Sequence, residues 1–239
     1  MTTSLERLKV RIFADGANKA DMMALYQQPW ISGFTTNPTL MRKAGITDYE
    51  AFAKNVISAI PDLPISFEVF SDDFVEMKRQ ALTISTWGEN IYVKIPVTNT
   101  LGVSSCALIR ELSGSGVKLN VTALMTVSQV REVADALQKG PVSYISVFAG
   151  RIADTGRDPL PIMTEALEIM RPYPNEQLIW ASPRELLNIF QADAIGCHII
   201  TVTNDILQKL SGVGKDLNQF SLETVKLFRE DAVAAGFVL

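Results

Sequence analysis

The chain of 239 residues contains only two cysteines and one histidine, and this scarcity narrows the chemistry open to it. Cys106 and Cys197 are far apart and lie among apolar residues, so we expect two reduced, buried thiols rather than a disulfide. The sequence shows no Cys/His/Asp/Glu cluster with metal-ligand spacing, which argues against a zinc or iron site. A Ser-His-Asp or Cys-His mechanism would need His198, which we expect instead to be a strand residue with a satisfied hydrogen bond.

Strong positive charge and long apolar runs are also missing. The net charge is −4 with interspersed signs, so no basic face would attract nucleic acid or anionic lipid. No segment approaches the ~18 uninterrupted apolar residues of a membrane span, and Met1–Lys9 lacks the apolar core of a signal peptide. We therefore expect a cytoplasmic protein without nucleic-acid or membrane partners.

Apolar runs of strand length alternate along the chain with amphipathic stretches of helix length. Eight parallel strands separated by helices predict an α/β fold, a closed (β/α)₈ TIM barrel, rather than an open doubly wound sheet. No linker or low-complexity segment divides the sequence, so we expect a single domain over residues 1–239. The predicted strands are Val10–Ala14, Gly33–Thr36, Ile65–Phe70, Ile91–Val97, Lys118–Leu124, Tyr144–Ala149, Leu178–Ser182 and Cys197–Thr203.

The helical patterns come with caps and breakers. Asp48 and Asp73 are expected to cap helix starts, and Gly114-Ser115-Gly116 to end a helix rather than form a phosphate loop. Beyond the eighth strand, Ser221–Ala235 predicts an extra amphipathic helix that covers a barrel end or packs on a neighbouring subunit. The other predicted helices are Asp48–Ile60, Asp73–Trp87, Gly102–Ser113, Val127–Leu137, Pro159–Met170, Arg184–Ala192 and Asp205–Leu210.

Lys94 lies in the middle of the apolar run Tyr92–Val97, which we predict to be a buried strand stopped by Pro96. Lysine is almost never fully buried without a reason. Desolvation favours the neutral amine, which can attack a carbonyl carbon. Lys94 is therefore a candidate Schiff-base lysine; the alternative is a lysine at the strand's end whose ammonium reaches water.

Other polar residues recur at the carboxyl ends of the predicted strands, where barrels of this kind carry their chemistry. A carboxylate near an amine can move protons, hydroxyls and amides can bind sugar hydroxyls, and late-strand arginines are placed to hold a phosphate. Each residue alone could be a turn former or a surface group, but together they predict a site for carbonyl chemistry on a polyol. The candidates are Asp15, Thr35, Thr36, Asn37, Glu68, Lys94, Asn120, Thr122, Ser146, Arg151, Ser182 and Arg184.

Several of these candidates belong to sequence motifs. The motifs are Asp15, Gly33-Phe34-Thr35-Thr36-Asn37-Pro38, Val93-Lys94-Ile95-Pro96, Asn120-Val121-Thr122, Ser146-Val147-Phe148-Ala149-Gly150-Arg151 and Ala181-Ser182-Pro183-Arg184. With these motifs in this order, the chain resembles the transaldolase family, in the small form that also includes fructose 6-phosphate aldolases. The resemblance runs from Phe13 to the final helix.

The resemblance implies an enzyme that moves a dihydroxyacetone unit from fructose 6-phosphate or sedoheptulose 7-phosphate to an aldose phosphate. Lys94 would form the Schiff base, and Asp15 would take the hydroxyl proton as the C3–C4 bond breaks. Glu68 and Thr122 would hold the water that shuttles protons. Because the protonated imine is the electron sink, no metal or organic cofactor is implied. A homo-oligomer is implied as well.

The resemblance also assigns the substrate-binding residues. Asn37, Asn120 and Ser146 would bind the three-carbon unit, and Arg151, Ser182 and Arg184 would bind the anionic group at the far end of the sugar. Thr36 and Phe148 complete the expected set.

Two positions bear on whether the dihydroxyacetone unit is transferred to an acceptor or simply released after cleavage of the sugar. Transferases of the family resemble this chain at Glu68 and Phe148, whereas the aldolases tend to have glutamine and tyrosine there. A tyrosine hydroxyl could help protonate a free enamine, and Phe148 cannot. We therefore favour transfer over release.

The chain also departs from the family pattern. Pro183 stands where a phenylalanine is common, His198 where an aspartate is common, and Arg157 adds an arginine near the expected anion site. The distal anion thus stays open between a phosphate and a sulfonate, as in the sulfofructose transaldolases. The alternatives to a sugar-phosphate transaldolase are a sulfofructose transaldolase, an aldolase-type lyase and a non-catalytic sugar-phosphate-binding protein.

Overall fold

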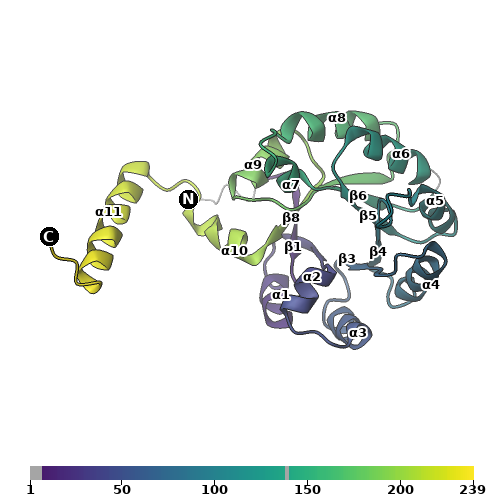
Figure 1. Ribbon diagram of the computed structural model, residues 1–239, viewed down its shortest axis with the longest axis horizontal. Coiled ribbons are helices and arrows are strands. Elements are labelled where there is room, and N and C mark those ends of the chain that lie inside the picture. Colours follow the sequence, from purple (N-terminus) through teal and green to yellow (C-terminus); the bar gives the residue numbers. More distant parts are fainter. Residues whose placement is uncertain (1–6, 138–139) are drawn as a thin grey trace.

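A computed structural model describes residues 7–137 and 140–239 and shows a closed barrel of eight parallel strands with helices around it (Figure 1). Each strand pairs with the next along the chain, and the last strand pairs with the first. The predicted (β/α)₈ TIM barrel is thereby confirmed. The strands are β1 (Arg11–Asp15), β2 (Ile31–Thr35), β3 (Ile65–Glu68), β4 (Ile91–Pro96), β5 (Leu119–Leu124), β6 (Ser143–Val147), β7 (Glu176–Trp180) and β8 (Ile199–Thr203).

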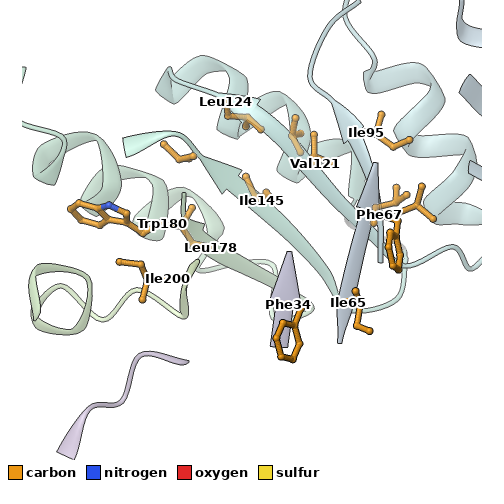
Figure 2. Packing of buried hydrophobic residues seen from close by; sticks show 14 of the residues in the cluster. Phe34, Ile65, Phe67, Ile95, Val121, Leu124, Ile145, Leu178, Trp180 and Ile200 are labelled. Carbon is orange, nitrogen blue, oxygen red and sulfur yellow. The ribbon is translucent and has the colours of Figure 1, made fainter. Parts of the chain in front are cut away.

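The strands separate two apolar clusters. Side chains alternate across a strand, so Ile12 and Ala14 pack in the large outer cluster against the helices, whereas Phe13 points into the barrel. Inside, Tyr92 and Tyr144 stack with ring centroids 4.0 Å apart, and Phe13 meets Tyr144 edge-on at 5.7 Å. Figure 2 shows part of the outer cluster, including Phe34, Ile65, Phe67, Ile95, Val121, Leu124, Ile145, Leu178, Trp180 and Ile200.

The inner aromatic cluster determines where polar groups can lie. Phe13, Tyr92 and Tyr144 fill the barrel interior, and the next inward-facing residue on each strand is polar: Asp15 on β1, Lys94 on β4 and Ser146 on β6. The layer nearest the carboxyl ends is therefore polar, while the layer below it is apolar. The barrel interior is therefore polar near the carboxyl ends of the strands and is closed below by apolar side chains.

Several helix predictions are confirmed by the caps. The Asp48 side chain accepts a hydrogen bond from the Ala51 amide, and that of Asp73 accepts one from the Glu76 amide, each at 2.9 Å. Gly114 ends its helix, as expected. The helices are α1 (Lys19–Tyr26), α2 (Pro38–Lys43), α3 (Tyr49–Ala59), α4 (Phe74–Ser85), α5 (Cys106–Gly114), α6 (Val127–Leu137), α7 (Ala149–Ala153), α8 (Leu160–Met170), α9 (Leu187–Ala194), α10 (Asn204–Leu207) and α11 (Leu217–Ala234), with a 3₁₀ turn over Gln208–Gly212.

Some predicted boundaries are wrong. Pro96 is the last residue of β4 rather than a stop beyond it, and Ala149 opens α7 instead of ending a strand. The last helix begins at Leu217, because the Asp216 side chain caps it by accepting from the Gln219 amide at 2.9 Å. Cys106 is partly exposed rather than buried, although both cysteines are free thiols.

Helix α11 lies away from the barrel in Figure 1, at the yellow end of the chain. It has no buried residue within the described chain, although Leu217, Phe220, Val225 and Phe228 are large and apolar, each at least 53% exposed. The helix therefore covers no end of its own barrel, which contradicts one of the two roles expected for it. One domain over residues 1–239 stays a prediction.

In the part of the chain that the structure describes, no helix has both the length and the apolar character needed to cross a membrane. Most of the segment Met1–Lys9, on which the leader prediction rests, lies outside the described residues. The cytoplasmic location stays a prediction.

Candidate active site

A cavity of about 690 Å³ opens at the carboxyl ends of the strands, where the polar candidates were expected. It is lined by residues from β1, β2, β3, β4, β5, β6 and β8 and from the segments that follow β2, β6, β7 and β8. The predicted residues on its wall are Asp15, Thr35, Asn37, Glu68, Lys94, Asn120, Thr122, Ser146, Phe148, Arg151, Ser182 and Arg184.

Lys94 lies at the base of this cavity and is 6% exposed. Strand register places Glu68 beside it on β3 and Asn120 beside it on β5. Lys94 Nζ is 3.0 Å from Glu68 Oε2 and donates a hydrogen bond to the Thr36 carbonyl oxygen at 2.8 Å. A buried charge needs such partners. The alternative of a lysine whose ammonium reaches water is therefore wrong.

Asp15 ends β1 and faces the cavity next to β2. The Thr35 hydroxyl donates a hydrogen bond to Asp15 Oδ1 at 2.7 Å. Burial raises the pKa of the Asp15 carboxyl above its ordinary value, while Lys94 and the Thr35 hydrogen bond oppose this and the Glu68 charge adds to it. A raised pKa brings the carboxyl closer to the range in which it can both take and return a proton.

Asn120 is held in one orientation by two buried hydrogen bonds. The Ser146 hydroxyl donates to Asn120 Oδ1 at 2.7 Å, and Asn120 Nδ2 donates to Ser66 Oγ at 3.0 Å. The amide oxygen thus has a partner, and the second Nδ2 proton is left for a ligand. Ser66 was not predicted as a site residue, although it lies two residues before Glu68 and so on the same face of β3.

Thr122 presents a buried hydroxyl at the cavity wall. Its side chain is 2% exposed, and Thr122 Oγ1 has no hydrogen-bond partner among the described residues. Beyond it, Ala123 has a φ of 66°, and the pairing of β5 with β6 shifts register between Val121 and Leu124. An unsatisfied buried hydroxyl costs about 1–3 kcal/mol, so this one favours binding of a water or a substrate oxygen.

The two arginines lie at the outer part of the cavity. The Arg151 guanidinium is 5.5 Å from the centre of the Phe148 ring, within the range of a cation–π contact. Arg184 Nε donates to Asp154 Oδ1 at 2.8 Å, and its Nη2 also contacts Asp154 Oδ2, a bidentate pair. The pKa of Asp154 is lowered by its hydrogen bonds from Arg184 and by the charges of both arginines.

Gly150 lets the two arginine-bearing segments meet. A Cβ atom added to Gly150 would lie 1.5 Å from the Ser182 carbonyl oxygen, so any side chain there would push the two segments apart. Ser182 itself has a φ of 59°, in the left-handed region that few L-residues adopt. The geometry of the arginine pair therefore depends on a glycine in one segment and a strained serine in the other.

Three residues that the sequence analysis singled out are not on the cavity wall. Thr36 is fully buried with its hydroxyl donating to the Ser66 carbonyl oxygen at 2.9 Å, so its backbone rather than its side chain serves Lys94. Arg157 is exposed and is not on the cavity wall. His198 precedes β8 and its Nδ1 accepts from the Leu178 amide at 3.0 Å, which confirms the expected hydrogen bond but outside the strand.

Other residues at the site escaped prediction. The Tyr49 hydroxyl bridges the backbone of Glu68, accepting from its amide at 2.8 Å and donating to its carbonyl at 2.7 Å. Lys43 and Thr201 line the cavity, and Asp154 orients Arg184. Of these, Thr201 alternates with Thr203 along β8, a period-two signal; nothing in the sequence indicates the partners of Tyr49 and Asp154.

The arrangement combines a buried amine with two carboxylates, an unpartnered hydroxyl and outer cations. Within residues 7–137 and 140–239, the His, Cys, Asp and Glu side chains form no group of three that could hold a metal ion. An amine beside a carboxylate can add to a carbonyl carbon, and a second carboxylate can move a proton on the bound substrate.

Comparison with known sequences places nearly the whole chain in one family. The family model described as transaldolase/fructose-6-phosphate aldolase matches residues 12–237. A probable transaldolase from Dehalococcoides mccartyi is 34% identical over 202 residues, which cover 84% of this chain and 90% of that protein. A probable transaldolase from Thermoanaerobacter is 34% identical over 228 residues, covering 95% and 99%, and one from Streptococcus pyogenes is 33% identical over 225 residues, covering 93% and 97%.

Solved structures agree on the fold. An HpcH/Hpal aldolase/citrate lyase family protein from Burkholderia cenocepacia superposes with a TM-score of 0.58 at 14% identity, covering 93% of this chain and 98% of that one. A 2,3-dimethylmalate lyase superposes with a TM-score of 0.55 at 12% identity, covering 98% and 86%. At such identities the likeness concerns the barrel alone.

Proposed function

Because the chain belongs to the transaldolase/fructose-6-phosphate aldolase family, we propose that it transfers a dihydroxyacetone unit from a ketose phosphate to an aldose phosphate through a lysine Schiff base. Fructose 6-phosphate and sedoheptulose 7-phosphate are the proposed donors. The observation that supports this most directly is the buried Lys94 amine, 3.0 Å from the Glu68 carboxylate and inside a polar cavity.

The first step is imine formation. Lys94 Nζ, after giving a proton to Glu68, attacks the C2 carbonyl carbon of the ketose, and the carbonyl oxygen takes up a proton. Loss of that oxygen as water leaves a protonated imine. The short distance between Glu68 Oε2 and Lys94 Nζ and the free Thr122 hydroxyl support a role for these residues in holding the water that carries the protons.

The second step breaks the carbon–carbon bond. Asp15 takes the proton of the C4 hydroxyl, the C3–C4 bond breaks, and its electron pair moves toward the imine nitrogen to give an enamine on Lys94. The shortened sugar leaves as an aldehyde, and an aldose acceptor then reacts by the reverse sequence. The iminium nitrogen accepts the electrons, so the proposal requires no metal or organic cofactor.

Substrate binding is divided between the two ends of the cavity. We propose that Asn37, Asn120 and Ser146 bind the three-carbon unit, since all three lie on the cavity wall with Lys94. Asn37 Oδ1 accepts from the Leu40 amide at 2.9 Å, which leaves its Nδ2 for substrate. At the outer end, Arg151, Ser182 and Arg184 would hold the distal anion.

A coupled assay tests the proposal. The protein is given fructose 6-phosphate with and without erythrose 4-phosphate, and the products are separated by mass. Transfer yields sedoheptulose 7-phosphate and glyceraldehyde 3-phosphate only when the acceptor is present. Cleavage without an acceptor would identify an aldolase-type lyase, and binding without turnover would identify a non-catalytic binding protein.

A sulfonate at the distal end remains a second candidate because of one contact. Asp154 offsets one positive charge at Arg184, so the arginine pair presents less net charge than two free guanidinium groups. A singly charged sulfonate suits such a site as well as a phosphate dianion does. The same assay with sulfofructose as donor separates the two, since a higher kcat/KM for sulfofructose would favour the sulfosugar.

The Phe148→Tyr/Glu68→Gln double variant is expected to release more free dihydroxyacetone than the wild type does. A tyrosine hydroxyl at the cavity wall supplies a proton to the enamine, which frees the three-carbon unit before an acceptor arrives. Dihydroxyacetone is measured by enzymatic reduction in the absence of an acceptor. Equal release by the two proteins would count against transfer as the native activity; Phe52→Tyr/Glu50→Gln, on α3, serves as the control.

We also propose that the protein is a homo-oligomer, and α11 supplies the support. Its Phe220 and Phe228 are exposed on a helix that has no buried residue in the part of the chain that the structure describes. Sedimentation velocity is expected to give a mass well above the 26.3 kDa of one chain, and Phe220→Ser/Phe228→Ser to lower it. Val75→Ser, at another exposed apolar position, is the control. A wild-type monomer would contradict the proposal.

A further inference from the structure

Two buried threonines, Thr35 and Thr201, lie next to Asp15, and neither takes part in the proposed reaction steps. Thr35 is 3% exposed and donates to Asp15 Oδ1 at 2.7 Å. Thr201 is 6% exposed, and its hydroxyl is hydrogen-bonded to the Thr35 hydroxyl. The three side chains therefore form a chain of hydrogen bonds that ends on the carboxylate.

The barrel topology brings these residues together. Strand β1 lies between β2 and β8, with Thr35 of β2 level with Asp15 and Thr201 of β8 level with Phe13. Ala14, between Phe13 and Asp15, points outward into the other cluster, so the two hydroxyls meet on the inner side of β1. Thr35 and Thr201 also both line the cavity.

The number of hydroxyl protons fixes which group donates and which accepts in each of these hydrogen bonds. A hydroxyl carries one proton, and when Asp15 is ionised the Thr35 proton goes to the carboxylate. The bond between the two hydroxyls is then donated by Thr201 and accepted by Thr35. A donor that itself accepts a hydrogen bond is polarised and donates more strongly, so Thr201 strengthens the bond to Asp15.

The same chain can serve the neutral carboxyl. When Asp15 Oδ1 carries a proton, it can donate to Thr35, and Thr35 can then donate to Thr201 by rotation of two hydroxyl protons. No heavy atom has to move for this reversal. A threonine pair suits a residue that takes up and returns a proton in each turnover.

We propose that Thr201 is a positioning residue that acts through Thr35 to orient the Asp15 carboxylate for proton transfer. The proposal rests on the proposed function, in which Asp15 is the acid/base.

Charged groups around Asp15 act alongside this chain. Lys94 and Glu68 face it across the cavity. A neighbouring cavity of about 420 Å³ shares Asp15 and is lined by Lys43, Asp21 and Asp205 as well. None of these charges changes in a threonine-to-valine substitution, so such a variant isolates the hydrogen-bond chain.

The test is a carbon NMR titration of the Asp15 carboxyl in the full-length protein, assigned with Asp15→Asn. Thr35→Val is expected to raise the pKa of Asp15 because the ionised form loses a donor, and Thr201→Val to raise it by less. Thr201→Ser keeps a hydroxyl and is expected to restore the wild-type titration. Ser113→Ala removes a buried hydroxyl outside the site, bonded to the Leu137 carbonyl, and is expected to change nothing.

Kinetics provide the second readout. Thr201→Val is expected to lower kcat about fivefold with little change in KM, since one weakened hydrogen bond is worth about that factor. The pH limb of kcat that reports Asp15 is expected to move with the NMR titration. The proposal would be overturned if the Asp15 titration is unchanged in Thr201→Val, or if Asp15 titrates in Thr201→Ser as it does in Thr201→Val. If the wild type has no transferase activity, the proposed function fails, while the titration still decides on the hydrogen-bond chain.

Discussion

Replacing Lys94 by methionine is expected to abolish transfer, with kcat/KM falling by more than about 1,000-fold because the covalent intermediate can no longer form. Methionine has a similar length and fills the 6% exposed position without a charge. The substitution leaves Glu68 and the Thr36 carbonyl without their donor, so we expect a loss of stability of about 1–3 kcal/mol but a folded barrel. Coupled kinetics and thermal unfolding by circular dichroism measure the two effects.

A second lysine gives the matched control. Lys118 Nζ also donates to a backbone carbonyl, that of Glu89 at 2.6 Å, but Lys118 is only half-buried and is not on the cavity wall. Lys118→Met is expected to retain full activity. Lys94→Met activity within tenfold of the wild type would refute the Schiff-base role. If the wild type shows no turnover and Lys94→Met binds the sugar phosphate only modestly more weakly than the wild type, the result would instead favour a non-catalytic binding protein.

Asp15→Asn is expected to stop the reaction one step later. The amide keeps the size of the side chain and an oxygen that can accept from Thr35, but it cannot take the C4 hydroxyl proton. Loss of a general base lowers kcat by about 10²–10⁴-fold. Lys94 can still form the imine, so the whole ketose should accumulate on the enzyme.

Mass spectrometry after borohydride reduction distinguishes this variant from the wild type. With fructose 6-phosphate, Asp15→Asn is expected to carry the complete six-carbon sugar phosphate, whereas the wild type carries the three-carbon fragment. Asp72→Asn, whose carboxylate binds the Thr100 amide and hydroxyl at the surface, is the control and should behave as the wild type. A three-carbon adduct formed at the wild-type rate by Asp15→Asn would assign the proton transfer to another group.

The barrel itself could be predicted because its strands are apolar along most of their length and its amphipathic helices are regular. The runs around Ile95 and Ile145 stand out for this reason, and both lie in strands. Short helices could not be found in this way: α2 has six residues and α7 has five, too few to show a helical period. The apolar run at Val147 continues into Ala149, so the sequence alone did not show where β6 ends.

The site residues that could be predicted are those that lie at the carboxyl ends of the strands. Lys94 and Glu68 lie level on adjacent strands, as the carboxyl ends of a parallel barrel require. Contacts that join distant segments left no such signal. Asp154 reaches Arg184 across 30 positions of sequence, and Tyr49 binds Glu68 from a helix. Such pairs depend on how α3 and α7 sit on the barrel, which no local pattern of residues determines.

The measurement that tests the central claim most directly is intact-mass spectrometry of the wild type after borohydride reduction with fructose 6-phosphate, sedoheptulose 7-phosphate and sulfofructose in separate reactions. A three-carbon adduct is predicted, located on Lys94 by peptide mapping and missing in Lys94→Met. The donor that labels fastest identifies the sugar and its distal anion. An adduct on another lysine, or no adduct with any of the three donors, would contradict the lysine Schiff-base account.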